Sequence, residues 1–528
     1  MSKKIILDVL WGVALVCGIL LCLWGINLPY VGIDNANNNF LALASKNFLR
    51  FGYTTLHFLP TYYVGKTLPA VIPYYLHHPV LFFLLASVPF RLFGNANWVV
   101  HATNLVFVIA SLFVLYHLVR EAVNEEAARW TVVFAVLMPW FSFFWKYIFF
   151  EQSSLFFTLT TLYFCIRYWK SQRPIYLWGV GVAAFLGGAT DWYGGYLAFG
   201  FLYLLFARSE KRIWPTFWSY ALGEFLGLGT YFLALVLTGN VGAIWNGYSA
   251  RGVTSELSAV SYWPLRLVAI TILRLLIYGS PLLVVSLWAW LRRKGTVGKS
   301  LLWHVGVMLF IVGIINMVVM PSATWGLSYF LYYLVPFAAL VCGVWVASIA
   351  KRSVALVYTI ILIQLFWCFG VTALKFTQMT KQTWRYDFGR DVSHIVPRYQ
   401  KVGVLEYPGD VLQNYFLIDA LPMSEPSVAS WVEHGKPSDI RYTVVSCKGT
   451  CTSEELAYLE RVRQKVGVQE FRYGQNTGWL VDRESAANIT KGSPAVTERA
   501  PELEPQRAPS GFLYWYRKVR DFLGSTQI

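Results

Sequence analysis

The stretch that decides the fold of this chain is polar and follows directly after the first apolar segment. It runs from Gly32-Ile33-Asp34-Asn35 through Tyr75-Leu76-His77-His78-Pro79 to Arg91-Leu92-Phe93-Gly94. Charged side chains are costly in the hydrocarbon of a bilayer, so a stretch of this composition does not cross it. The sequence therefore predicts a long loop, residues 29–96, that lies at a membrane surface and carries a carboxylate, cations and two histidines.

The composition of the whole chain is that of an integral membrane protein. Of the 528 residues, 56% are hydrophobic and 17% aromatic, and only 14% are charged, against about 25% in an average soluble domain. The formal net charge of +16 could indicate a nucleic-acid partner. The basic residues, however, cluster in short connections between apolar runs, where cytoplasmic loops of membrane proteins carry them. We therefore expect membrane lipids around the protein and no nucleic acid as a partner.

Eleven apolar runs have the length, or nearly the length, of a membrane-spanning helix, which takes about 20 residues. They lie at 7–28, 97–119, 130–150, 153–169, 175–190, 193–207, 214–238, 279–291, 301–320, 327–350 and 353–373. The sequence thus predicts a polytopic α-helical membrane protein with about 11 transmembrane helices.

Basic residues fall in alternate connections between these runs. They are Lys3 and Lys4, Arg120 and Arg129, Arg167 to Arg173, Arg208 to Arg212, Arg292 to Lys299, and Lys351 and Arg352. Because short cytoplasmic loops are rich in Lys and Arg, this pattern predicts a cytoplasmic N-terminus and outer loops at 29–96 and 239–278. Within the second outer loop, Arg266 and Arg274 interrupt an apolar run, which is typical of a helix lying in the membrane interface. The expected location is the cytoplasmic membrane of a bacterium or archaeon.

The chain changes character after its transmembrane domain, 1–373. Residues 374–484 are charged and turn-rich, and two short runs within them have strand composition, so we expect a small extracytoplasmic α/β domain. Residues 485–528 have the composition of a flexible segment followed by an amphipathic helix. Cys447 and Cys451 in the soluble domain predict a disulfide, because a metal site would need more ligands nearby.

Two acidic residues on the predicted outer face are candidates for chemistry. Asp34 follows the first helix, where a carboxylate reaches both water and lipid headgroups and can act as a general base. Glu151 ends the third apolar run, also on the outer side, and acids at a membrane face are costly and usually functional. The competing interpretations are a turn residue for Asp34 and a helix cap for Glu151.

Several outer cations and polar side chains are candidates for contacts with an anionic substrate. Arginine suits a bidentate phosphate contact, although each cation could equally be an interface anchor. Two adjacent histidines do not share one helix face, so His77 and His78 do not predict a two-histidine metal site within one element. Asp191 in the next outer turn is a further candidate, with a structural role as its alternative. The full set of candidate substrate contacts is Lys46, Arg50, His77, His78, Asp191, Arg251, Arg266, Tyr329 and Tyr332, with Tyr333 in the same cluster.

These segments in this order resemble the glycosyltransferase C-type superfamily, and most closely the protein O-mannosyltransferases and the lipid A aminoarabinose transferases. Asp34 matches the acid after the first helix, and His77-His78-Pro79 matches the His/Lys-Pro segment of the first loop. The resemblance continues with the segments Phe150-Glu151-Gln152-Ser153-Ser154, Gly187-Gly188-Ala189-Thr190-Asp191-Trp192 and Tyr329 to Pro336. It covers about 1–350.

The resemblance implies a polyprenyl-phosphate sugar donor and inverting displacement at the anomeric carbon. It also implies Asp34 as the base, with cations near Arg50 and His78 on the donor phosphate. The acceptor would be a protein, a lipid or a glycan. Two departures, Asn35 where many relatives have a second acid and Glu151 where Asp is usual, leave open a divalent metal ion held by Glu151 and His78.

Two other classes of function compete with this reading. A lipid or solute transporter would show ionisable residues at mid-membrane depth and two paired halves of the chain, whereas here the charges gather at one face. A non-catalytic scaffold that displays the soluble domain would not need an acid, cations and histidines in one outer region. The sequence therefore favours a membrane glycosyltransferase that moves a single sugar.

Overall fold

The chain forms two compact units in the computed structural model. The structure describes residues 3–29, 36–94, 96–146, 150–207, 211–242, 257–258, 260–292, 301–326, 328–405, 412–422, 440–447, 466–473, 476–482 and 497–498. The first unit comprises Met1–Thr254 and Ser261–Thr383, and the second comprises Ser255–Val260 and Trp384–Ile528. Each unit is described by itself.

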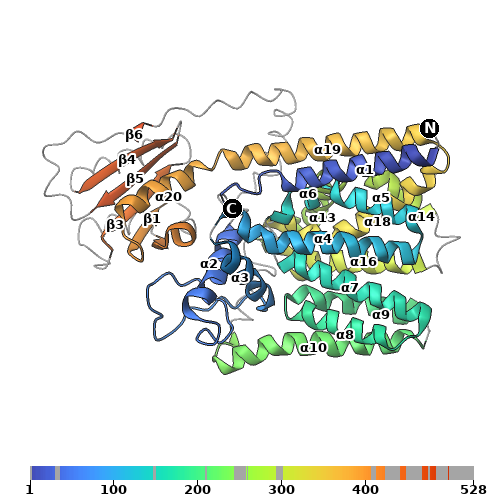
Figure 1. Cartoon of the computed structure of the whole chain (residues 1–528), viewed down its shortest axis with the longest axis horizontal. Coiled ribbons are helices and arrows are strands. Elements are labelled where there is room, and N and C mark those ends of the chain that lie inside the picture. The colour runs from blue at the N-terminus through green and yellow to red at the C-terminus, as the bar shows by residue number, and fades with distance from the viewer. Residues whose placement is uncertain are drawn as a thin grey trace. The chain divides into compact units, whose positions relative to one another are not determined.

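The first unit is a bundle of helices (Figure 1). Its longer helices are α1 (Lys3–Leu23), α4 (Asn97–Ala122), α5 (Glu125–Val136), α7 (Phe150–Ser171), α8 (Ile175–Gly188), α9 (Leu197–Ala207), α10 (Ile213–Leu237), α14 (Leu283–Arg292), α16 (Leu301–Val319), α18 (Val335–Ala350) and α19 (Val354–Thr380). Among the described residues, six helices are long and apolar enough to cross a membrane, or up to eight if each of two bent pairs is one span. The polytopic helical membrane fold is therefore confirmed.

Each of the eleven apolar runs falls on a helix or on a bent pair of helices, but the number of spans stays a prediction. The run at 130–150 is not one straight helix, because α5 ends at Val136 and α6 (Pro139–Ser142) follows after a 62° bend. Pro139 accounts for the break, since proline cannot continue the hydrogen-bond ladder of a helix. The last run also differs, because α19 continues past residue 373 to Thr380.

The core of the first unit depends on close contacts between small residues. Helix α18 is the most deeply buried of the apolar helices, and Gly343 on it lies against the backbone of Thr131 on α5. On α10, Gly223 and Gly227 lie in the same way against carbonyl groups of α8. Glycines let membrane helices approach closely and gain van der Waals contact. The α8–α10 contact matters for the site, because it holds the turn that follows α8.

The loop between α1 and α4, which the sequence predicts to be an outer loop, has defined secondary structure over its described residues from Ala36. It contains α2 (Ala36–Phe51), an isolated antiparallel bridge between Thr61 and Tyr74, and α3 (Leu81–Phe93). The side-chain amide of Asn47 donates to the carbonyls of Thr61 and Tyr63, 2.8 and 2.9 Å away. Elsewhere in the loop, the Tyr231 hydroxyl on α10 donates to the carbonyl of Leu76. These hydrogen bonds hold the loop against α2 and α10.

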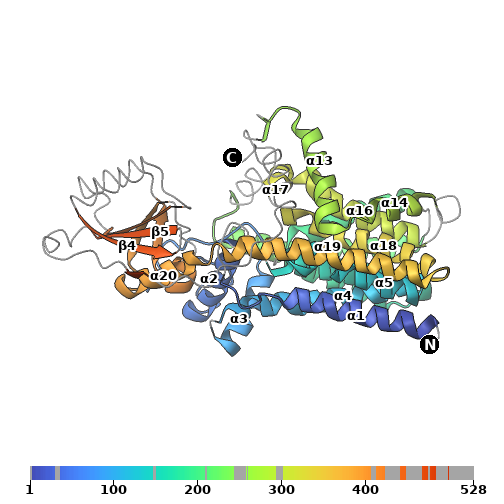
Figure 2. The same ribbon diagram turned by 90° about the horizontal axis from the view of Figure 1, so that it is seen from above.

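The second outer segment contains a sharp bend. Helix α13 (Trp263–Arg274) continues as a π-helical turn, η4 (Leu275–Gly279), and then turns by 105° into α14. Figure 2 shows α13 leaving the side of the bundle. Such a bend belongs to a broken span or a re-entrant segment, and the interfacial position of this helix stays a prediction.

The second unit contains a six-stranded mixed sheet in the order β2-β1-β3-β5-β4-β6. The strands are β1 (Lys401–Leu405), β2 (Asp419–Pro422), β3 (Tyr442–Cys447), β4 (Gly467–Tyr473), β5 (Asn476–Asp482) and β6 (Thr497–Glu498). Strand β1 pairs in parallel with β2 and β3, whereas β5 pairs antiparallel with β3 and β4. Helix α20 (Trp384–Ile395) packs on the sheet through Phe388, whose ring lies against Gly478.

The predicted C-terminal sheet is thus present, and both runs of strand composition form strands, β1 and β3. The predicted disulfide lies outside the described residues, because Cys451 and the side chain of Cys447 are not among them. The predicted terminal segment, 485–528, lies outside them too, apart from Thr497 and Glu498.

Candidate active site

Three segments that are far apart in the sequence contact one another, and the first of them is part of the predicted outer loop. The first is the His77-His78-Pro79 segment, the second is the start of α7, and the third is the turn after α8. This turn is fixed to the outer loop, because the carbonyl of Ala189 accepts the Leu81 N–H at 3.0 Å. The turn continues as a 3₁₀ helix, η3 (Trp192–Tyr196), which Asp191 caps by accepting the Trp192 N–H at 2.9 Å.

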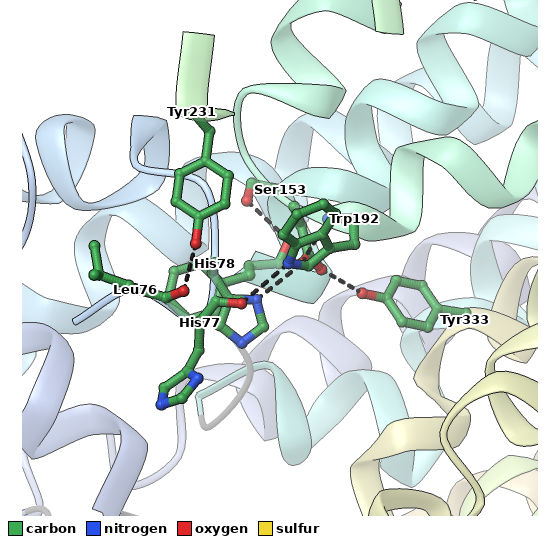
Figure 3. A network of polar contacts seen from close by, with 9 residues as sticks. Leu76, His77, His78, Ser153, Trp192, Tyr231 and Tyr333 are labelled. Atoms are coloured by element: carbon green, nitrogen blue, oxygen red, sulfur yellow. Dashed lines mark hydrogen bonds and ion pairs between the residues drawn. The ribbon is translucent and has the colours of Figure 1, made fainter. Parts of the chain in front are cut away.

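Figure 3 shows His78, Trp192 and Tyr333 in one network of polar contacts, and the contact between His78 and Asp191 is central to it. His78 Nδ1 lies 2.9 Å from Asp191 Oδ1, and the two side chains are 15% and 7% exposed. The second carboxylate oxygen of Asp191 accepts a hydrogen bond from the Tyr333 hydroxyl at 3.2 Å. The indole N–H of Trp192 donates to the carbonyl of His77 at 3.0 Å. The histidine segment is therefore tied to the turn through both a side chain and the backbone.

Aromatic rings hold the plane of the His78 imidazole. The ring stacks on Phe150 with 4.4 Å between centroids and 5° between planes. Tyr75 lies nearly parallel to the imidazole, with centroids 6.1 Å apart. Phe150 is the first residue of α7, so the stacking places the half-buried Glu151 in the next position along that helix. His78, Asp191 and the start of α7 are thus brought into one cluster.

Two tyrosines of the segment from Tyr329 to Pro336 lie beside this cluster. Tyr332 and Tyr333 lie on η5 (Ser328–Leu334) and are buried. The Tyr332 hydroxyl donates to the side-chain carbonyl of Gln152, next to Glu151, while Tyr333 reaches Asp191. The amide of Gln152 in turn donates to the Ser111 hydroxyl at 2.9 Å.

Two of the predicted cations lie one helical turn apart on α2. The Arg50 guanidinium donates to Asn47 Oδ1 at 2.7 Å and to the carbonyl of Gly65 at 3.0 Å. The Lys46 ammonium lies over the ring of Phe90, 5.8 Å from its centroid. Burial, and after it the nearby positive charge of Arg50, lowers the pKa of Lys46 to about 7. An anion bound beside Lys46 would restore its positive charge.

Other predicted site residues are not part of this cluster, or cannot be placed in it. Asp34, Arg251 and the side chain of Tyr329 lie outside the described residues. Arg266 is exposed on α13, and in the part of the chain that the structure describes it makes no contact with His78 or Asp191. His77 packs edge-on against Tyr75, with ring centroids 5.2 Å apart.

The structure adds residues that the sequence analysis did not select. Glu224 on α10 is buried, and within the described segments neither of its carboxylate oxygens has a hydrogen-bond partner. A methyl group at Gly194 would come within 2.8 Å of these oxygens, so Glu224 lies directly against the turn that carries Asp191. A single acid within the apolar run at 214–238 was a signal for a functional residue. Lys146 is also buried, with its ammonium 5.3 Å from the Trp145 ring centroid.

A metal ion is not supported by the described residues. They contain no group of three or more His, Cys, Asp or Glu side chains that could hold one. The suggested ligands were Glu151 and His78, and of these His78 is engaged with Asp191 through Nδ1. We therefore derive no step through a metal.

The comparisons with a protein-family model and with solved structures indicate the same fold. Residues 77–236 match the family model of the dolichyl-phosphate-mannose-protein mannosyltransferases, a range that contains His78, Glu151, Asp191 and Glu224. Comparison with curated protein sequences gives no match.

Solved structures of membrane glycosyltransferases share the fold over most of their length. ArnT from Cupriavidus metallidurans in the apo state is 12% identical, with a TM-score of 0.59 over 89% of this chain and 97% of ArnT. The same protein bound to undecaprenyl phosphate is 13% identical, also with a TM-score of 0.59, over 90% and 97%. An oligosaccharyltransferase from Archaeoglobus fulgidus, in complex with Zn and sulfate, is 13% identical with a TM-score of 0.52, over 89% and 72%.

The chain therefore has the glycosyltransferase C-type fold, as an integral membrane protein of many helices. Within that fold it is similar to ArnT and to the protein O-mannosyltransferases, and the resemblance read from the sequence is confirmed.

Proposed function

We propose that this protein is a membrane glycosyltransferase that moves one sugar from a polyprenyl-phosphate donor to an extracytoplasmic acceptor. The observation that carries the proposal is the family match over residues 77–236, a range that includes both His78 and Asp191, which contact each other. The fold is also shared with a transferase bound to undecaprenyl phosphate. The matching family and structures are sugar transferases, which favours this function over a transporter. The acceptor is a protein, a lipid or a glycan.

The reaction requires a base on the acceptor. Asp34 takes the proton of the acceptor hydroxyl as that oxygen attacks the anomeric carbon. The bond between this carbon and the phosphate oxygen breaks, and polyprenyl phosphate leaves with the bonding electron pair. Attack from the face opposite the leaving group inverts the configuration. We assign this role to Asp34 because of its position in the sequence, just before α2. Glu151, at the start of α7, assists it.

The leaving phosphate gains one negative charge in this step, so cations beside it lower the barrier. Arg50, Lys46 and His78 are the groups proposed for this role, and Arg251 and Arg266 of the second outer loop are proposed as further contacts. Arg50 suits the role because its guanidinium is always charged and is oriented by Asn47. Lys46 has a pKa of about 7, so an approaching phosphate can draw a proton onto it.

The orientation follows from the charge pattern of the connections. We assign the outer loops, 29–96 and 239–278, and the C-terminal unit to the extracytoplasmic side. The transmembrane domain is then 1–373 and the soluble domain 374–484. This places the donor phosphate at the outer leaflet.

The test is turnover by the purified full-length protein, with polyprenyl-phosphate sugars as donors and protein, lipid and glycan acceptors supplied together. Turnover is measured as the release of polyprenyl phosphate. We expect release with at least one sugar, and loss by about 100-fold or more in Asp34→Asn, because general-base catalysis contributes about 10²–10⁴-fold. Circular dichroism and thermal unfolding check that the variant folds. Full turnover by Asp34→Asn would remove Asp34 from the role, and no release with any donor would contradict the function.

A further inference from the structure

A second cluster of charged and aromatic side chains lies at the far ends of α4 and α7. The predicted outer loop leads into the start of α4, and its His78 stacks on the first residue of α7. The second cluster occupies the last turns of both helices, together with the start of α8, and the proposed function uses none of it. It is called the basic cluster here and consists of Arg120, Glu121, Tyr163, Arg167, Lys170 and Tyr176.

Positive charges outnumber negative ones in the basic cluster. The Glu121 carboxylate lies 2.9 Å from the Lys170 ammonium and 3.5 Å from the Arg167 guanidinium. The exposed Arg120, one position before Glu121, interacts electrostatically with the same carboxylate. The following acid, Glu125, forms an ion pair within its own helix, α5. Three cations of the cluster therefore share one carboxylate, which leaves an excess of positive charge.

Two tyrosine hydroxyls orient the guanidinium of Arg167. Its Nη1 donates to the Tyr163 hydroxyl at 3.2 Å, and its Nη2 donates to the Tyr176 hydroxyl at 2.6 Å. A hydroxyl that accepts a hydrogen bond still has its own proton to donate. In the part of the chain that the structure describes, neither hydroxyl donates to a protein acceptor. A fixed guanidinium with two hydroxyl donors beside it suits a phosphate group.

An exposed apolar face of α4 leads to the basic cluster. Val106, Ile109 and Phe113 are 65%, 60% and 64% exposed. Their spacing of three and four residues places them on one side of the helix, and Arg120 follows on that side two turns after Phe113. Helix α4 is long and apolar enough to cross a membrane, so this face contacts lipid chains. A ligand with a phosphate head and an apolar chain fits both surfaces, whereas a free phosphate would contact only the cluster.

We propose that the basic cluster binds the phosphate of an anionic phospholipid, whose acyl chain lies along the exposed face of α4. Basic sites between membrane helices on the cytoplasmic side bind anionic lipid heads, and the charge pattern of the connections predicts that side for this end. A zwitterionic head would bring a positive charge next to Arg120 and is disfavoured. The bound lipid contacts α4, α7 and α8 together and stabilises their packing. The inference is independent of the sugar transfer proposed at the outer loop.

The test is lipid binding by the full-length protein in detergent, measured by native mass spectrometry. Dioleoylphosphatidylglycerol and dioleoylphosphatidylcholine are titrated separately, with no polyprenyl phosphate present. We expect the anionic lipid to bind about 10-fold more tightly, because cations near the membrane surface favour anionic heads. Inorganic phosphate added as a competitor should not displace it, because it lacks the acyl chain. Displacement by inorganic phosphate at low millimolar concentration, or equal affinity for the two lipids, would overturn the proposal.

Two variants test the charge and the hydroxyl donors separately. Arg120→Gln removes one positive charge from an exposed position, so affinity for the anionic lipid should fall by about 5-fold. The double variant Tyr163→Phe/Tyr176→Phe keeps every charge and removes both hydroxyls, and affinity should fall by about 10-fold. The double variant thus distinguishes a built site from general attraction of anionic lipid to a basic end of the bundle. Circular dichroism checks that both variants fold.

The matched control is Arg352→Gln, which removes an equal charge from an exposed position. Arg352 lies in the turn between α18 and α19, on the same predicted side of the membrane, and its variant should bind the lipid like the wild type. The anionic lipid should also raise the melting temperature of the wild type more than that of the double tyrosine variant. Equal losses of affinity in Arg120→Gln and Arg352→Gln, or wild-type affinity in the double variant, would overturn the inference.

Discussion

The ionisable side chains of the proposed donor site are half-buried or buried. Lys46 and Arg50 share one side of α2, and His78 shares a buried contact with Asp191. Burying a charge without an opposite charge or hydrogen bonds is costly. For Lys46, the free-energy cost of burying the charged form is seen in its lowered pKa of about 7. A phosphate ligand would add a negative charge beside Lys46, so ligand binding and the protonation of Lys46 should be coupled.

The stability of the ligand-free protein should depend on pH through Lys46. Below about pH 7, Lys46 is charged in both the folded and the unfolded protein. The folded protein then carries the full free-energy cost of burying this charge. Between about pH 7 and the ordinary pKa of about 10.4, the unfolded chain binds more protons, so stability rises with pH by up to about 1.4 kcal/mol per unit. Lys46→Met should remove this contribution and raise the melting temperature more at pH 6 than at pH 9.

The measurement is thermal unfolding in detergent across this pH range, compared between wild type and Lys46→Met. Only the difference between the two proteins is interpreted, because other groups titrate in both. An equal change in melting temperature at both pH values would contradict a buried, titrating Lys46.

At the scale of helices, glycine contacts set the spacing that brings the site together. Gly343 on α18 lies against the backbone of Thr131 on α5, and no side chain can occupy that space without moving a helix. Gly223 and Gly227 bring α10 against α8, which places Tyr220 and Glu224 beside the turn that carries Asp191.

Gly343→Ala should therefore destabilise the protein by about 1–3 kcal/mol, the usual cost of overpacking a close contact. The matched control is Gly370→Ala on α19, where nothing lies within 4 Å of the added methyl group. That variant should be neutral or gain about 0.5–1 kcal/mol, because glycine is unfavourable inside a helix. Equal melting temperatures for the two variants would show that the α5–α18 contact is not as close as described.

The sequence predicted the helices better than the contacts between them. Long apolar runs determine where helices form, so all eleven runs fall on helices, and the break at Pro139 has a visible local cause. The contact of His78 with Asp191 joins positions 113 residues apart, and no local pattern determines it. The sequence named both residues as candidates without joining them.

Glu224 could have been found from the sequence, because a lone acid in an apolar run is a functional signal. The stacking of Phe150 on His78 could not, since aromatic residues are frequent throughout this chain. The number of spans also stays a prediction, because several helices, such as α8 and α9, are shorter than a bilayer requires.

The whole molecule is a membrane bundle of the glycosyltransferase C-type fold, with a cluster of charged residues at the loop between α1 and α4. The fold is shared with ArnT over 97% of that protein's length. The proposed function adds to this fold a place for the donor phosphate beside His78, which contacts Asp191. That place is the central claim.

The most direct test is a structure of the full-length protein in a nanodisc with undecaprenyl phosphate bound. The account predicts that a phosphate oxygen lies about 3 Å from the His78 ring, with Arg50 or Lys46 also in contact. A phosphate bound where His78 cannot reach it would contradict the account.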